Sequence, residues 1–206
     1  MKRKNLILLV ICLFLSLAFV RKERVFVKYV YDGDTILLET GQRVRYAGID
    51  APELDHEGNK NEFMAREAKE FNEELVMGKP IRLELDKKKR DRYGRLLAYV
   101  YIESGLMVNG MLVRKGLAHV LADRPNLKHF KQLLRMQRIA MTEGLGIWKN
   151  QPIKIEEYYI ASKKSFRFHR PSCPFGRRIW PKNRLVFKDR KSAFWNGFSP
   201  CKKCRP

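Results

Sequence analysis

The chain has 206 residues, of which 45% are hydrophobic. These values suit one medium domain with a small appendage and exclude a disordered protein. Lys and Arg number 43 against 22 Asp and Glu, a formal net charge of +21. Such a basic balance predicts a polyanionic partner, nucleic acid first and an anionic membrane or wall surface second.

The positive charge is concentrated near the C-terminus. Residues 151–206 carry 15 Lys and Arg against 3 acidic residues, a net +12. Residues 1–24 carry a net +5, which leaves +4 for residues 25–150. Composition therefore predicts that the tail holds nucleic acid nonspecifically. The alternative is a solvated basic surface on a small domain.

The first 24 residues have the pattern of a targeting segment. Lys2-Arg3-Lys4 precedes an apolar run over residues 6–20 in which only Ser16 is polar. The run is 15 residues long, shorter than the ~20 residues that a spanning helix needs. We expect a signal peptide cleaved after Ala18, or an uncleaved signal anchor. A cleaved signal peptide would make the protein secreted. An uncleaved anchor would tether it, through residues 6–20, to the outer face of the cytoplasmic membrane.

Strand-like segments follow. Residues 25–31 are β-branched and aromatic, and turns at residues 32–34 and 40–42 separate them from the next candidates. The further candidate strands are 35–39, 43–47, 81–85 and 96–102. A charged loop over residues 86–95 joins the last two of them.

Helices are predicted where apolar residues recur at three- and four-residue spacing. The expected helices are 64–75, 108–115 and 127–141, followed by a linker at 149–152. About five strands with a few helices allow a small closed barrel of the OB type or an open α+β sheet. Periodicity alone does not choose between these two architectures.

Acidic side chains cluster at two turns that follow strands. Asp32 and Asp34 flank a glycine, and Asp50 and Glu53 flank Ala51-Pro52. Carboxylates from two separate turns, together with backbone carbonyls, make a hard-oxygen site suited to Ca²⁺. The Asp-Gly-Asp pattern alone is more typical of an ordinary turn.

Two arginines favour a catalytic interpretation. Arg45 lies five residues before Asp50 on a candidate strand, and Arg95 begins another. Phosphodiester cleavage needs a metal on a nonbridging oxygen, a base for the attacking water and donors for the charge on phosphorus. The planar fork of arginine suits the last task. For each arginine alone, a surface ion pair is the alternative.

Four ordered segments carry a family resemblance between about residues 27 and 148. They are Asp32-Gly-Asp-Thr35, Arg45-Tyr-Ala-Gly-Ile-Asp-Ala-Pro-Glu53, Asp91-Arg-Tyr-Gly-Arg-Leu-Leu-Ala-Tyr-Val100 and Val108-Asn109 with Leu112-Val-Arg-Lys-Gly-Leu-Ala118. In order and spacing they resemble the staphylococcal nuclease family. The resemblance implies an OB-fold barrel with three helices and Ca²⁺-dependent cleavage of DNA and RNA.

The resemblance also implies roles for single residues. Asp34 and Asp50 bind Ca²⁺ by their carboxylates, and Ala51 binds it by its backbone carbonyl, which survives the replacement of the familiar Thr. Glu53 is the general base or orients the water. Three further residues act on the substrate: Arg45 and Arg95 stabilise the transition state, and Tyr93 lies near the phosphate.

The tail contains a candidate metal site. Apart from Cys12, the chain has three cysteines, Cys173, Cys201 and Cys204, and His169 stands four positions before the first of them. One imidazole and three thiolates suit a closed tetrahedral zinc site, which would also stabilise a small segment. A disulfide is the alternative, since an exported protein meets an oxidising compartment.

Residues 159–206 also resemble the metal-binding module of Ada-type DNA alkyl-repair proteins. The likeness rests on Ala161-Ser-Lys163, Arg170-Pro-Ser-Cys173, Ser192-Ala193 with Gly197-Phe198, and Pro200-Cys-Lys-Lys-Cys-Arg-Pro206. In that family the first of four cysteines accepts a methyl group. His169 stands in its place here, so we expect zinc-supported folding and DNA-backbone binding without alkyl transfer.

These observations predict an exported Ca²⁺-dependent nuclease with three parts: a leader at 1–24, a nuclease domain at 25–150 and an Ada-like metal-binding domain at 151–206. Two alternatives remain open. One is a barrel of the same fold that binds nucleic acid without cutting it. The other is a wall- or membrane-surface protein whose basic tail binds an anionic polymer.

Overall fold

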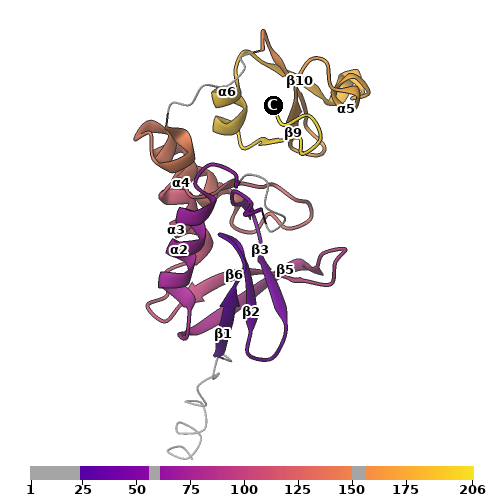
Figure 1. Cartoon of the computed structure of the whole chain (residues 1–206). Helices are drawn as coiled ribbons and strands as arrows, with labels where there is room; N and C mark the ends of the chain where they lie inside the picture. Colours follow the sequence, from indigo (N-terminus) through magenta and orange to yellow (C-terminus); the bar gives the residue numbers. More distant parts are fainter. Residues whose placement is uncertain (1–23, 56–60, 150–155) are drawn as a thin grey trace, which may run out of the picture.

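The computed structural model describes residues 24–55, 61–149 and 156–206. A barrel flanked by helices lies below a smaller C-terminal unit (Figure 1). The predicted leader and most of the predicted linker at 149–152 lie outside the described residues. Within these three ranges, no helix combines the length and the apolar composition that a membrane crossing requires.

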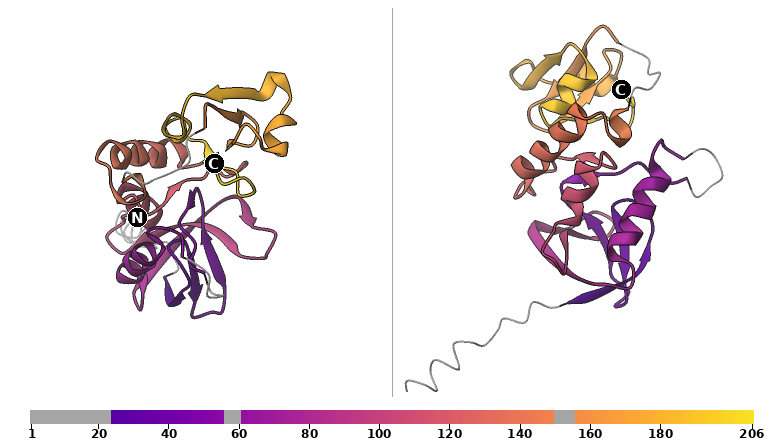
Figure 2. Two further views of the ribbon diagram at one scale, coloured as in Figure 1. Left: turned by 45° about the horizontal axis from the view of Figure 1, so that its top comes forward. Right: turned by 90° about the vertical axis from the view of Figure 1, so that its left-hand side faces the viewer.

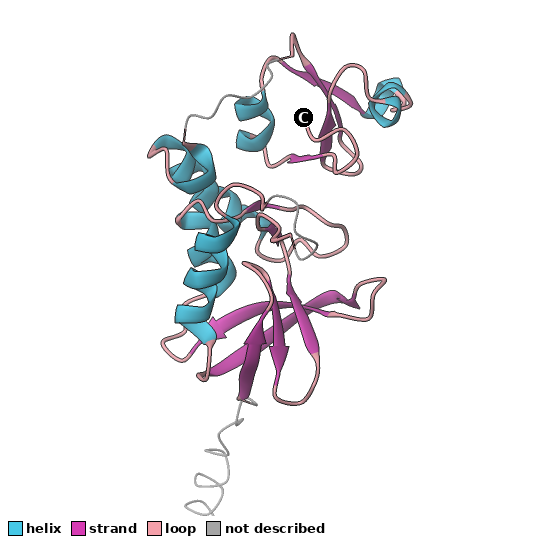
Figure 3. Cartoon of the chain, viewed as in Figure 1, coloured by secondary structure: helices cyan, strands magenta, loops and turns pink. Residues whose placement is uncertain are grey.

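Five strands close into a barrel in the order β1-β2-β3-β6-β5, and Figure 3 shows the strands in magenta. The barrel is therefore closed, which confirms the OB-type expectation over the open sheet. Neighbouring strands are antiparallel except β3 and β6, which run parallel. Fully buried Ile36, Val44 and Val100 contribute to its core. The strand bounds are β1 Val25–Val30, β2 Thr35–Leu38, β3 Arg43–Tyr46, β5 Pro80–Arg90 and β6 Leu96–Ile102.

The expectation of a loop over residues 86–95 is wrong for its first half. Strand β5 continues to Arg90, which pairs with Leu96 after a register shift. The Asn126 side chain supports this extension, because it donates to the Lys88 carbonyl at 2.7 Å and accepts from the Lys88 N–H at 2.8 Å. The segment is charged and mostly exposed, so hydrophobic alternation could not reveal it.

Helices α2, α3 and α4 lie along one side of the barrel (Figures 1 and 2). Their bounds, with those of the short helix η1, are α2 Ala65–Val76, α3 Val108–Arg114, α4 Phe130–Thr142 and η1 Gly146–Trp148. A small strand pair, β4 (Ile49–Asp50) with β7 (His119–Val120), sets Asp50 opposite His119. Strands this short carry no periodic signal, and the sequence did not predict them.

The C-terminal unit is built on a sheet in the order β10-β8-β9-β11, with Phe168, Phe194 and Phe198 in a second hydrophobic cluster that also includes Met141 of α4. Trp180, by contrast, is 72% exposed, so not every aromatic side chain of this unit is buried. The bounds are β8 Tyr159–Ser162, β9 Arg167–His169, α5 Pro174–Arg177, η2 Pro181–Asn183, β10 Arg184–Phe187, α6 Arg190–Trp195 and β11 Ser199–Pro200.

The C-terminal unit packs against helix α4. Gly197, at φ +80°, approaches Phe130 so closely that a Cβ atom there would lie 2.6 Å from the ring. The Phe130 ring in turn lies 5.8 Å from that of Phe166. Glycine is therefore required at this contact for both its backbone conformation and its lack of a side chain.

Candidate active site

Two acidic turns converge on one arginine. Arg45, on β3, contacts Asp34 Oδ2 through Nη1 and lies 2.5 Å from Asp50 Oδ1 through Nη2. The side chains of these three residues are only 9%, 5% and 12% exposed. Water therefore screens their charges little. The structure thus brings together three of the residues that the sequence singled out.

Gly33 allows the first turn to reach this position. A Cβ atom there would meet the Cβ of Ala51 at 2.7 Å and that of Ala68, on α2, at 2.8 Å. Contacts this short would force the turn away from α2 and from the second acidic turn. Asp34 can therefore reach its position only because Gly33 has no side chain.

The cluster carries surplus negative charge. Burial raises the pKa of Asp34 well above its ordinary value, the Arg45 guanidinium opposes this rise, and the charges of Asp32 and Asp50 add to it. Burial also acts on Asp50, but Arg45 and then His119 hold its pKa below the usual value. One guanidinium does not balance these acids, so a cation with more than one charge would stabilise their ionised forms.

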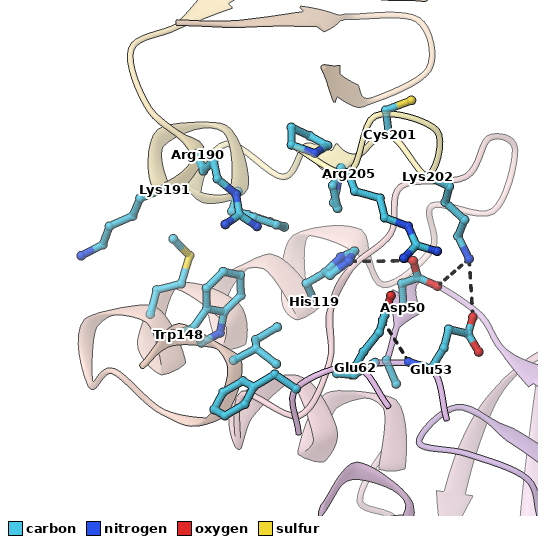
Figure 4. A pocket seen from close by; sticks show the side chains of 18 of the residues that line it. Asp50, Glu53, Glu62, His119, Trp148, Arg190, Lys191, Cys201, Lys202 and Arg205 are labelled. Atoms are coloured by element: carbon cyan, nitrogen blue, oxygen red, sulfur yellow. Dashed lines mark hydrogen bonds and ion pairs between the residues drawn. The ribbon is translucent and has the colours of Figure 1, made fainter. Parts of the chain in front are cut away.

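Ala51 and Glu53 stand directly beside this cluster. The Ala51 N–H donates to Asp34 Oδ2 at 2.6 Å. The Glu53 N–H donates to Glu62 Oε2 at 3.0 Å (Figure 4). The Glu53 side chain itself is 56% exposed, so substrate and water can reach its carboxylate. The second turn is thus fixed through its backbone while its acid stays accessible.

Arg95 and Tyr93 lie on the neighbouring strand connection. Arg95 precedes β6, and Leu97 of that strand pairs with Arg45. The Arg95 Nε donates to Asp91 Oδ2 at 2.7 Å. The Arg95 guanidinium is therefore bound by Asp91 and not by Asp34 or Asp50. Tyr93 is 68% exposed, with the Arg95 guanidinium 5.6 Å from its ring. Both residues precede the strand that pairs with Arg45, and their roles stay predictions.

Two further residues contact the acids, and the sequence did not predict them. His119 Nε2 lies 3.8 Å from Asp50 Oδ2. Lys202, from the C-terminal unit, places Nζ 3.6 Å from both Asp50 Oδ1 and Glu53 Oε1 (Figure 4). Nothing in the Cys201-Lys-Lys-Cys204 sequence indicates this contact, because it depends on how the two units pack.

The four predicted metal ligands of the tail converge. One ligand atom from each of His169, Cys173, Cys201 and Cys204 lies within 4.8 Å of the others. The Sγ of Cys173 is 3.4 Å from His169 Nδ1. His169 ends β9, Cys173 precedes α5, and the two remaining cysteines follow β11. One imidazole and three thiols at this spacing fit a tetrahedral zinc ion.

The electrostatics of the thiols also fit a cation. The three cysteines are free thiols in the structure. Burial raises the pKa of Cys204 to about 12, and the neighbouring thiols Cys173 and Cys201 add to the rise. Several thiolates together are unfavourable unless a metal ion offsets their charge. The donor set thus fits zinc.

Comparison with known proteins decides the family. Residues 43–150, which run from β3 to just past η1, match the family model described as "Staphylococcal nuclease homologue". The chain belongs to the staphylococcal nuclease family. This nuclease also matches the "Metal binding domain of Ada" over residues 149–206, so both resemblances drawn from its sequence are confirmed.

Several relatives carry nuclease names. The nuclease is 36% identical to the thermonuclease of Staphylococcus hyicus over 124 residues, which cover 59% of this chain and 73% of the relative. It is 35% identical to the thermonuclease of Staphylococcus intermedius over 133 residues, 63% of this chain and 79% of the relative. An uncharacterized endonuclease of Haemophilus influenzae is 30% identical over 157 residues, 74% of this chain and 82% of the relative.

Family and geometry together establish the class of reaction. The chain is a nuclease, a hydrolase that acts on the phosphodiester bonds of nucleic acid. It joins the nuclease barrel to a His-Cys metal site of the Ada type.

Proposed function

We propose that this nuclease is exported and depends on calcium, and that it hydrolyses both DNA and RNA. In this proposal residues 25–150 cut the substrate, and the zinc module at 151–206 helps to hold it. The convergence of Asp34 and Asp50 on Arg45, with Glu53 accessible beside them, is the observation that carries the proposal.

The acidic cluster supports calcium as the catalytic ion. Asp34 and Asp50 would hold it by their carboxylates and Ala51 by its backbone carbonyl, all hard oxygen donors. Burial, and to a smaller extent the charges of Asp32 and Asp50, raises the pKa of Asp34, and a divalent cation would favour its ionised form. When bound, calcium would polarise a nonbridging phosphate oxygen and offset the charge that develops on the phosphate.

The protein's own groups would perform the remaining tasks. Glu53 accepts a proton from the attacking water, so that a new P–O bond forms as the bond to the leaving oxygen breaks. Arg45 has five N–H donors and uses three of them on Asp34, Asp50 and the Ile49 carbonyl. Among the described residues, the other two have no assigned acceptor and would be available to the phosphate, which Arg95 and Tyr93 would approach from the neighbouring strand connection.

Sequence composition supports the location and the role of the tail. The basic start and the apolar run over residues 6–20 support export, with the protein released or held by this run on the outer face of the membrane. The net +12 of residues 151–206 supports electrostatic binding of a polyanion. We assign His169, Cys173, Cys201 and Cys204 as the zinc ligands.

The Glu53→Gln variant tests the proposed chemistry. We expect kcat for an oligonucleotide in Ca²⁺ to fall by at least about 100-fold, because the general base is lost, while substrate affinity changes little. Glu67→Gln, an exposed position on α2, is the matched control. Equal losses of turnover and affinity would contradict the role of Glu53. Tight binding by the unaltered chain without any cleavage would favour the non-cutting binding module.

A further inference from the structure

The C-terminal unit faces the catalytic acids across a cleft of about 860 Å³ (Figure 4). Asp50 and Glu53 line the nuclease side, and the cations Arg190, Lys202 and Arg205 line the opposite side. This volume is in the range of sites that hold a ligand. The cleft therefore begins at the catalytic acids and extends along a wall that belongs to the zinc module.

Lys202 connects the two walls of this cleft at the acids. Its Nζ is 3.6 Å from Asp50 Oδ1 and 3.6 Å from Glu53 Oε1. It lies between Cys201 and Cys204, two members of the metal cluster. The metal site thus fixes the backbone that carries this lysine. A cation held beside the proposed base and metal ligand is placed to contact a phosphate there.

Two residues that line the cleft have a buried donor that lacks an acceptor among the described residues. Trp148 Nε1 and Arg190 Nε are buried and have no hydrogen-bond partner among the described residues. Both residues line the cleft, one from η1 and the other from α6. A buried donor without an acceptor costs about 1–3 kcal/mol. Because both atoms are shielded from solvent, a ligand oxygen in the cleft would reach them once the neighbouring side chains move aside.

The contact made by Lys202 bears on the form of the ligand. At the acids, the side chain of Lys202 bridges the two walls of the cleft. A double helix is wider than its major groove, which measures about 12 Å, so it would reach the acids only after this contact is broken. A single strand offers phosphates to the cations and unpaired bases to the aromatic side chains, which here include Trp148 with Phe194 at 5.0 Å.

We propose that the cleft between the two units is a binding site for a single strand of nucleic acid next to the scissile bond, with Lys202 contacting a phosphate beside the catalytic acids. The zinc module is then one wall of the substrate site and not a remote anchor. This inference rests on the proposed function, because it takes Asp50 and Glu53 as the place of cleavage.

Adjacent lysines provide a matched pair of variants. Lys203 is exposed and belongs to the same Cys-Lys-Lys-Cys segment, but it forms no ion pair among the described residues. Lys202→Met and Lys203→Met remove the same charge from neighbouring positions of the intact chain. Thermal unfolding of both variants checks that the fold is retained. Trp148→Phe, which keeps a ring but removes the unpaired donor, tests the part of the cleft lined by Trp148 and Arg190.

Binding of a fluorescent single-stranded oligonucleotide is measured in EGTA over a series of salt concentrations, which separates it from cleavage. We expect Lys202→Met to weaken binding about fivefold and to reduce the salt slope by about 0.7, the value for one phosphate contact on a single strand. Lys203→Met should change the slope by less than half of this. Trp148→Phe should weaken binding and leave the slope unchanged, and a duplex of the same sequence should bind less tightly than the single strand.

Three outcomes would overturn the inference: equal effects of the two lysine variants, equal binding of duplex and single strand, or tighter binding and faster cleavage by Lys202→Met. The last would make Lys202 an inhibitory plug. A chain that binds the single strand through Lys202 but does not cleave it in Ca²⁺ would instead refute the proposed function and leave the cleft site standing.

Discussion

The buried side-chain amide of Gln137 hydrogen-bonds to the backbone carbonyl of Phe194, with 2.6 Å between Nε2 and O. Its Oε1 accepts from the Val120 N–H, also at 2.6 Å. Gln137 is fully buried on α4, so one side chain joins the nuclease strand β7 to helix α6 of the zinc module. The two units are thus coupled in the same region that forms the cleft.

Replacing Gln137 by Met should destabilise the chain by about 2–4 kcal/mol, because two buried backbone groups lose their partners at about 1–3 kcal/mol each. Urea unfolding measures the difference. Arg138→Met is the control, since its bond to the Trp195 carbonyl is exposed, and it should cost less than about 1 kcal/mol. Similar losses in the two variants would show that the amide does not join the units.

Asp34→Asn should separate calcium binding from folding. In Ca²⁺ at 100 times its dissociation constant, the unaltered chain should gain about 2.7 kcal/mol by mass action. The variant should lose this gain. In EGTA it should be at least as stable as the unaltered chain, because burial already disfavours the ionised carboxylate that the substitution removes.

Thermal unfolding in Ca²⁺ and in EGTA measures both effects. Asp123→Asn, at an exposed position, is the control and should keep the full calcium response. A calcium response that survives in Asp34→Asn would show that this carboxylate does not bind the ion.

The tail should contain one zinc ion, bound by cysteine thiolates that form no disulfide. Metal analysis of the intact purified chain is expected to find it, and Cys201→Ser should lose most of it because a tetrahedral site needs all four donors. Alkylation after chelation and unfolding should modify Cys173, Cys201 and Cys204 without prior reduction. A disulfide-linked peptide pair containing any of them would support the alternative interpretation.

Glu84 should make stability depend on pH in the acidic range. Its carboxylate accepts hydrogen bonds from Tyr101 and contacts Lys128 and His129, at the start of α4. Burial would raise its pKa, but the hydrogen bonds from Lys128, Tyr101 and His129 lower it from 4.5 to about 2. The stabilisation is therefore fully present above pH 4.5 and is lost as the pH falls toward 2.

Glu84→Gln should therefore cost about 1 kcal/mol at pH 7, a value reduced for partial screening by solvent. The cost should shrink as the pH falls below 4.5. Urea unfolding at several pH values measures it against Glu67→Gln, an exposed control on α2. A difference that stays constant with pH would contradict the assigned role of the Glu84 charge.

The sequence predicted the parts of the fold that local patterns determine. Alternation located most barrel strands, and helical spacing located α2, α3 and α4 to within a few residues at each end. The two acidic turns and Arg45 were also predicted correctly to converge. Turn residues and strand faces are set within a few positions of the chain, which explains this success.

The remaining features depend on contacts between distant segments. The extension of β5 rests on Asn126, and the small strand pair rests on His119 meeting Asp50. The approach of Lys202 to Glu53 depends on the packing of the C-terminal unit. None of these contacts leaves a periodic pattern in the sequence. The tight contact at Gly197 also depends on a distant residue, Phe130, and is recognised only in the folded structure.

Cleavage of supercoiled plasmid by the purified chain, in Ca²⁺ and then in EGTA, tests the central claim most directly. We predict nicked and linear products in Ca²⁺, none in EGTA and recovery when Ca²⁺ is restored, with Asp50→Asn inactive throughout. Equal cleavage in EGTA would contradict the calcium-dependent site at Asp34 and Asp50, and binding without cleavage in Ca²⁺ would contradict the catalytic assignment itself.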